Sequence, residues 1–129
     1  MAACQEGTLH LSRLNTTDIV IIVEGKNDQS RIQDLVRSDV KILCTFGIPN
    51  HTKVTQLVDS IRDAQVVIFT DNDHVGKRIR AILGEEFPDA LHLRTKSEYG
   101  GVEKTPFEYL TQLLIKHELI REDLMPKNL

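Results

Sequence analysis

Acidic side chains follow two apolar segments of the sequence, at the point where each segment ends. Asp71 and Asp73 come just after the run Val66–Phe69, and Glu24 directly follows the run Ile19–Val23. Carboxylates held at close range raise each other's pKa, so a shared cation is needed to keep them charged together. Carboxylate oxygens without Cys or His at ligand spacing are hard donors, which favour Mg²⁺, or Mn²⁺, over zinc or copper. The residues therefore predict a divalent-metal site built from Glu24, Asp71 and Asp73.

Strands and helices that alternate along the chain must position these acids. Apolar runs of strand length predict four strands, at Ile19–Val23, Val40–Thr45, Gln65–Thr70 and Ala90–Leu93. The first and third runs are apolar on both faces, as interior strands of a parallel sheet are. Apolar residues at helical spacing predict helices between the strands: Ile32, Leu35 and Val36; Val54, Leu57, Val58 and Ile61; and Val75, Ile79, Ile82, Leu83 and Phe87.

This alternation predicts an α/β domain, with a mostly parallel sheet of about four strands and helices on both faces. A last helix, with Pro106 at its start and Thr105 as N-cap, is expected to cover the remaining open face. Its inward residues would be Phe107, Leu110, Leu113 and Leu114. Ligands of open α/β sheets bind at the carboxyl ends of the strands, where the acids would meet. The polar loop Lys96–Lys104 would lie at the same edge.

The size and composition of the chain bound its possible functions. Its 129 residues are enough for one domain, expected at residues 18–129, with residues 1–17 as an N-terminal extension packed on it. The net charge of −3 means that any nucleic acid must be bound locally rather than by an overall basic surface. Cys4 and Cys44 fit no zinc or CxxC spacing, and no apolar stretch approaches the ~20 residues of a bilayer span. We therefore expect reduced thiols in a cytoplasmic protein without a membrane partner.

Basic residues and glycines beside the acids are candidates for binding a phosphate group. Lys26, Lys77 and Arg80 could contact phosphate oxygens, as basic side chains near helix N-termini do. The alternative for Lys77 and Arg80 is an ordinary solvated helix face. Gly25 and Gly76 would let the backbone approach a phosphate, or would simply form turns. We include all five, together with Asp28, as predicted substrate-binding residues.

The acids also have structural alternatives. Glu24 could be a helix-entry acid that the helix dipole favours. Asp73 stands at capping distance before the next helix, which would make it an N-cap and Asp71 a solvated turn acid. Asp28 could be the N-cap of the helix that contains Ile32, or it could support the substrate-binding site, and both interpretations stay open. If the three predicted ligands do hold a metal, they would stabilise charge on a phosphodiester, with Glu24 as general base or ligand of a second ion.

The two acidic segments together resemble the signature motifs of the Toprim domain family. The matching segments are Ile22–Asp28 (IVEGKND) and Thr70–Arg80 (TDNDHVGKRIR). This family includes type IA and type II topoisomerases, bacterial primases and ribonucleases that mature ribosomal RNA. The resemblance implies a compact Rossmann-like fold with a four-stranded parallel sheet. It also implies that Glu24, Asp71 and Asp73 surround Mg²⁺ at the carboxyl edge of that sheet.

The resemblance extends from Asp18 to the final helix and is greatest toward the ribosomal-RNA maturation ribonucleases and small stand-alone Toprim proteins. It rests on Thr70–Arg80 and on the later Gly101–Glu103. Lys26 and Arg80 match motif positions, which favours a functional role for both. The resemblance thus implies Mg²⁺-dependent phosphodiester chemistry on nucleic acid.

Functions of different classes stay open. The first is a metal-dependent endonuclease acting on structured RNA, of the ribosomal-RNA maturation type, or on DNA. The second is a non-catalytic or partner-dependent nucleic-acid-binding module, which the acidic net charge favours. A protein partner or a homo-oligomer is compatible with both. A receiver-like phosphoacceptor is a weaker third candidate, because Glu24 and Asp71 also end the first and third strands of a doubly wound fold.

Overall fold

Four parallel strands form one sheet in the computed structural model, which describes residues 18–61 and 63–125. The strands are β1 (Ile19–Val23), β2 (Val40–Cys44), β3 (Gln65–Phe69) and β4 (Leu91–Leu93). Their order across the sheet is β2-β1-β3-β4, so the two strands that are apolar on both faces lie in the middle. The parallel α/β sheet predicted from the sequence is confirmed. The expected extension, residues 1–17, lies outside the described residues.

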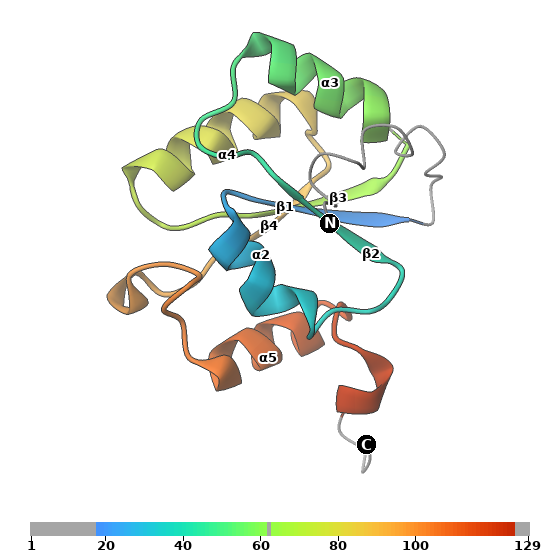
Figure 1. Ribbon diagram of the computed structural model, residues 1–129, viewed down its shortest axis with the longest axis vertical. Helices are drawn as coiled ribbons and strands as arrows, with labels where there is room; N and C mark the ends of the chain where they lie inside the picture. The colour runs from blue at the N-terminus through green and yellow to red at the C-terminus, as the bar shows by residue number, and fades with distance from the viewer. Residues whose placement is uncertain (1–17, 62, 126–129) are drawn as a thin grey trace.

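Helices cover both faces of this sheet (Figure 1). On one side lie α3 (His51–Ile61) and α4 (His74–Glu86), and on the other lie α2 (Lys26–Gln33) and α5 (Phe107–Lys116). Two short 3-10 helices, η3 (Ser97–Tyr99) and η4 (Glu122–Leu124), complete the described elements. As predicted, the last helix covers the face that α3 and α4 leave open.

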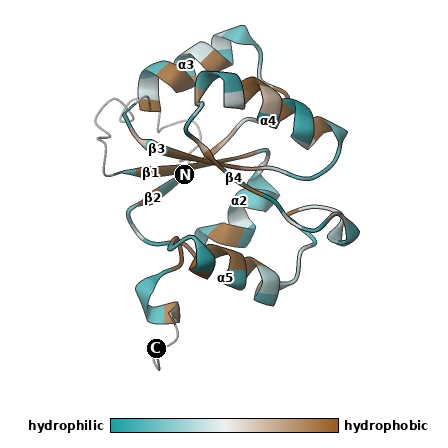
Figure 2. Ribbon diagram, turned by 180° about the vertical axis from the view of Figure 1, so that it is seen from behind, coloured by the Kyte–Doolittle hydropathy of each residue, from teal (hydrophilic) through white to brown (hydrophobic). Residues whose placement is uncertain are grey.

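Alternating residues of β1 divide the core into two layers, because successive side chains of a strand point to opposite faces. Ile21 and Val23 belong to the layer that includes residues of α2 and α5. Val20 and Ile22 belong to the layer beneath α3 and α4. Figure 2 shows the apolar sheet between helices that are polar on their outer surfaces. Because both faces of β1 are buried, the position of the strand is fixed. The position of Glu24, the first residue after β1, is fixed with it.

Three local predictions require correction. Helix α2 ends at Gln33, so Val36 lies beyond it and forms an antiparallel bridge with Ile120 instead. Phe107 was expected to face inward but is 53% exposed, because Leu110 and Leu114 already fill the buried face of α5. The N-cap of α5 is Pro106 rather than Thr105. The buried hydroxyl of Thr105 donates to the carbonyl oxygen of Gly101 at 2.6 Å.

The described helices have at most thirteen residues, the length of α4. Within residues 18–61 and 63–125, none combines the length and the apolar character that a bilayer crossing requires. The sheet in these same ranges has four strands, so no fifth strand carries the lysine that a receiver-like phosphoacceptor needs.

Candidate metal-dependent active site

Glu24 lies at the carboxyl end of β1, where the buried strand gives way to a half-buried position. Its carbonyl oxygen accepts a hydrogen bond from the backbone N–H of Phe46 at 2.6 Å, which ties the ends of β1 and β2 together. Burial raises the pKa of the Glu24 carboxyl, and the negative charges of Asp71 and Asp73 raise it further. Acids from two separate segments therefore influence one another through space, as the sequence predicts.

Asp71 is held by a loop that comes much later in the chain. Its Oδ1 accepts a hydrogen bond from the backbone N–H of Val102 at 2.8 Å. Gly101 has a φ of +126°, and a Cβ at this residue would lie 2.9 Å from Oδ2 of Asp71. A side chain at residue 101 would thus meet both unfavourable backbone geometry and the carboxylate. The prediction that this loop lies at the ligand edge is confirmed.

Asp73 is the N-cap of α4. Its Oδ1 accepts a hydrogen bond from the backbone N–H of Gly76 at 2.7 Å, and its side chain is exposed. The structural alternative for Asp73 is therefore correct. This bond is made by Oδ1 alone, which leaves Oδ2 as a possible metal ligand. Capping and metal binding are compatible, because a carboxylate carries two oxygens.

Gly76 allows the tight turn that brings Asp71 and Asp73 together. A Cβ at this residue would lie only 2.0 Å from the carbonyl oxygen of Asp71. The hydroxyl of Thr70 donates to the carbonyl oxygen of Gly76 at 3.1 Å, which closes the turn from the other side. Glycine is required here because the backbone of Asp71 lies so close to residue 76. This contact is internal to the protein and is not evidence that Gly76 approaches a phosphate.

Asp28 is an acid near the predicted ligands that is only 8% exposed. It is not an N-cap: Gly25 caps α2, and Oδ2 of Asp28 accepts from the backbone N–H of Gly25 at 3.2 Å. The pKa of Asp28 is raised from 3.8 to about 6, first by burial and then by the charge of Asp71. The hydrogen bond from Gly25 opposes this shift, whereas Glu24 and Glu103 add to it.

This shift makes a testable prediction about stability. The folded chain holds the Asp28 proton more tightly than the unfolded chain, so Asp28 destabilises the fold as pH rises from about 4 to above about 6, by up to about 3 kcal/mol. Asp28→Asn, which can still accept from Gly25, should remove that part of the pH dependence and raise the melting temperature at neutral pH. Thermal unfolding in EDTA across this pH range measures both effects. Exposed Asp59→Asn is the control, and equal behaviour of the two variants would contradict the prediction.

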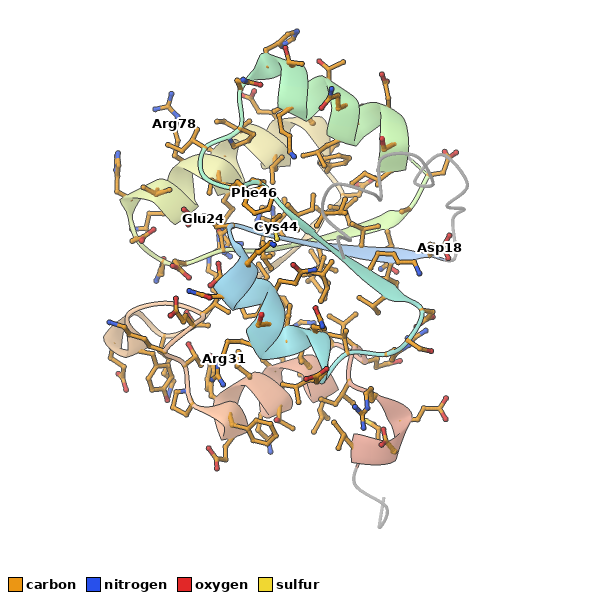
Figure 3. The ribbon with its side chains drawn as sticks, viewed as in Figure 1. Asp18, Glu24, Arg31, Cys44, Phe46 and Arg78 are labelled. Atoms are coloured by element: carbon orange, nitrogen blue, oxygen red, sulfur yellow. The ribbon has the colours of Figure 1, made fainter. Side chains whose placement is uncertain are left out.

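The acids line one hollow of about 470 Å³ at the carboxyl edge of the sheet. Its lining residues come from the ends of β1, β2 and β3, from α2 and from the late loop: Glu24, Gly25, Lys26, Asn27, Asp28, Phe46, Gly47, Asp71, Asp73 and Glu103. Figure 3 shows Glu24 and Phe46 at this edge, with Asp18 at the opposite edge. The predicted convergence of the acids is therefore found, and Phe46 and Glu103 join them.

Oxygen donors in the hollow fit a hard divalent cation. Within residues 18–61 and 63–125, no group of three or more acidic, His or Cys side chains is already arranged to hold a metal ion. The donor chemistry still fits, because the hollow presents several carboxylates and its described lining includes neither Cys nor His. The negative charges of Asp71 and Asp73 raise the pKa of Glu24, as expected for carboxylates that line one hollow. A cation would relieve the repulsion between these charges.

The predicted phosphate-binding residues are only partly brought to the hollow. Gly25 and Lys26 line it, and Lys26 is exposed at the first position of α2. Lys77 is also exposed, but it lies in the first turn of α4 and is not among the described residues that line the hollow. Lys26 is thus the best-placed of the predicted cations.

Arg80 does not have the exposed position that a phosphate ligand or a solvated helix face would require. It is 7% exposed, and burial lowers its pKa to about 10. Its guanidinium donates to the carbonyl oxygens of Thr70 and Leu93 at 3.0 and 2.8 Å, and of Ile68 at 3.3 Å. Arg80 therefore links the carboxyl ends of β3 and β4. One of its acceptors, Thr70, directly precedes Asp71. We correct the prediction that it binds substrate.

Similar proteins share both the fold and the sequence. No family model matches the sequence. A small TOPRIM domain protein from Bacillus stearothermophilus has a solved structure that superposes with a TM-score of 0.76 at 30% identity, covering 87% of this chain and 97% of that one. The uncharacterized protein YusF of Bacillus subtilis is 30% identical over 107 residues, which cover 83% of this chain and 73% of YusF.

Ribonuclease M5 proteins are also similar to this chain. That of Mycoplasma mycoides subsp. mycoides is 34% identical over 68 residues, which cover 52% of this chain. The match spans 38% of that ribonuclease, so the similarity reaches well under half of its length. The parallel sheet, the acids at its carboxyl edge and the similarity along most of the chain lead to one identification. The chain belongs to the Toprim domain family.

Proposed function

We propose that this protein is a Mg²⁺-dependent endonuclease that cleaves phosphodiester bonds of structured RNA, as in ribosomal-RNA maturation. The observation that carries this proposal is the convergence of Glu24, Asp71 and Asp73 on one hollow at the carboxyl edge of the sheet. Similarity to ribonuclease M5 proteins supports RNA as the substrate class. Mn²⁺ is the expected substitute for Mg²⁺, since both prefer oxygen ligands.

Glu24, Asp71 and Asp73 would hold the metal. When bound, the metal would neutralise the negative charge that develops on the phosphodiester during cleavage. Oδ1 of Asp71 is already oriented by Val102, and Oδ1 of Asp73 by Gly76, so the two aspartates need little rearrangement. This fixed geometry reduces the free energy needed to assemble the site.

Glu24 is the residue best suited to move a proton. One of its carboxylate oxygens can bind the metal while the other accepts a proton. Lys26 lines the same hollow and can pair with a phosphate oxygen of the substrate. The acids alone would repel a polyanion, so RNA binding should depend on the divalent ion.

A non-catalytic or partner-dependent nucleic-acid module is the alternative function. It is favoured by one observation: the similarity covers only 38% of the Mycoplasma mycoides ribonuclease M5. Such a module would use the same acids and metal to bind a phosphate without cleaving it. Binding and cleavage must therefore be measured separately.

The experiment incubates the purified protein with end-labelled hairpins of identical sequence in RNA and DNA, in Mg²⁺, Mn²⁺ or EDTA. We expect cleavage of RNA in Mg²⁺ or Mn²⁺, none in EDTA, and a strong loss of cleavage in Glu24→Gln. Asp59→Asn removes one exposed carboxylate of α3, outside the hollow, and should cleave like the wild type. Metal-dependent binding without cleavage would support the module, and cleavage of DNA alone would replace the proposed substrate. Absence of both binding and cleavage would refute both functions.

A further inference from the structure

Phe46 is an exposed aromatic residue beside the acids. It follows β2 by two positions, its side chain is 56% exposed, and it lines the same hollow as Glu24 and Asp71. In Figure 3 it lies at the same edge of the molecule as Glu24. Sequence reasoning missed it, because a phenylalanine after an apolar strand is ordinarily part of the core.

The backbone displays this side chain in an unfavourable conformation. Phe46 has a φ of +56°, which is uncommon for any residue other than glycine and is a clear outlier for a bulky one. The hydrogen bond from its N–H to the carbonyl oxygen of Glu24 holds it in that conformation. Gly47 follows, with a φ of +101°. Strained residues of this kind cluster at ligand-binding and active sites, since folding alone would favour glycine or asparagine there.

Two lysines lie near the Phe46 ring, at the edge of the sheet where the acids would bind the metal. The ammonium nitrogen of Lys53 lies 5.9 Å from the centre of the Phe46 ring. Lys26 lines the hollow on its α2 side. An exposed aromatic ring with a lysine over it, and a second lysine in the same hollow, suits a nucleic-acid strand, whose bases stack on aromatic rings while its phosphates pair with cations.

We propose that Phe46 stacks on an unpaired base of the RNA next to the phosphate that the acidic hollow receives. This inference rests on the proposed function and specifies its substrate class: the cleavage position lies beside an unpaired nucleotide, in a loop, a bulge or a strand end. A base inside a regular duplex is stacked on its neighbours and cannot offer its face to Phe46. Lys53 binds the phosphate that flanks the stacked base.

The test measures binding without cleavage. Fluorescein-labelled single-stranded oligoadenylate, and a matched strand with abasic sites, are titrated with the protein in Ca²⁺ and followed by anisotropy. Phe46→Ala should weaken binding of the base-bearing strand by about 5- to 100-fold and leave the abasic strand unaffected. Phe107→Ala is the matched control, because this phenylalanine is 53% exposed on α5 and does not line the hollow.

A second variant detects stacking directly. The chain contains no tryptophan, so Phe46→Trp introduces a single indole at the proposed contact. Oligoadenylate should quench its fluorescence and bind with an affinity close to that of the wild type, whereas the abasic strand should leave the fluorescence unchanged. Circular dichroism melting of each variant establishes that it is folded.

Several results would overturn the inference. If wild type and Phe46→Ala bind both strands equally, the stacking contact does not exist, although the proposed nuclease function survives. If Phe46→Ala instead changes the molecular mass measured by light scattering, the ring mediates contact between protein chains. If the wild type neither binds nor cleaves RNA, the proposed function fails and this inference fails with it.

Discussion

Asp71→Asn is expected to lower the rate of metal-dependent cleavage by about 10²- to 10⁴-fold, since a catalytic metal supplies several kcal/mol of charge stabilisation. The substitution removes a charge but keeps the shape of the side chain. Oδ1 of the asparagine can still accept from the N–H of Val102, so the late loop should stay in place. Single-turnover cleavage of labelled RNA at saturating protein concentration measures the effect on the chemical step.

The same variant should be at least as stable as the wild type when no metal is present. Asp71 raises the pKa of both Glu24 and Asp28, so removing its charge relieves repulsion of each. In EDTA the melting temperature should therefore be unchanged or higher, and added Mg²⁺ should stabilise the variant less than the wild type. If Asp71→Asn cleaves RNA at the wild-type rate and is stabilised by Mg²⁺ as much as the wild type, Asp71 is not a metal ligand.

Gly76→Ala should destabilise the fold by about 3 kcal/mol, at the upper end of the usual cost of overpacking. The added Cβ would lie 2.0 Å from the carbonyl oxygen of Asp71, and 2.8 Å from its carbonyl carbon, which are backbone atoms that cannot rotate away. Either the first turn of α4 or the end of β3 must move. We therefore expect a lower melting temperature and impaired cleavage, because Asp73 loses its capping geometry.

Gly84→Ala provides a matched control on the same helix. A Cβ at this residue would lie 3.7 Å from the ring of His92, an ordinary van der Waals contact. Alanine is favoured over glycine within a helix by roughly 0.5–1 kcal/mol, so this variant should be slightly more stable than the wild type. Chemical denaturation of the two variants tests the contrast. Equal stability would contradict the close approach of α4 to Asp71.

The strands and the convergence of acids could be predicted because they follow from local patterns. β1 and β3 are apolar on both faces, which identifies central strands, and parallel strands end at a common edge. Glu24 and Asp71 therefore had to lie near each other once the sheet was recognised. The hollow adds burial, which raises the pKa of Glu24 and of Asp28.

Other features depend on contacts that the local pattern does not contain. Arg80 lies off the apolar stripe of its helix, so its sequence position indicates solvent. Its long side chain instead reaches the carbonyl oxygens at the ends of β3 and β4. The bond from Val102 to Asp71 joins residues 31 positions apart, and neither residue type specifies it. Phe46 carries no signal either, since its positive φ is known only from the backbone.

The late origin of the Val102 hydrogen bond affects how the protein matures during synthesis. A ribosome must add 31 residues after Asp71 before the amide that orients this carboxylate exists. A nascent chain that has completed β3 and α4 thus carries the acids without their final constraint. The final orientation of Asp71 is therefore set only after the late loop has been synthesised and has packed against the carboxyl edge of the sheet.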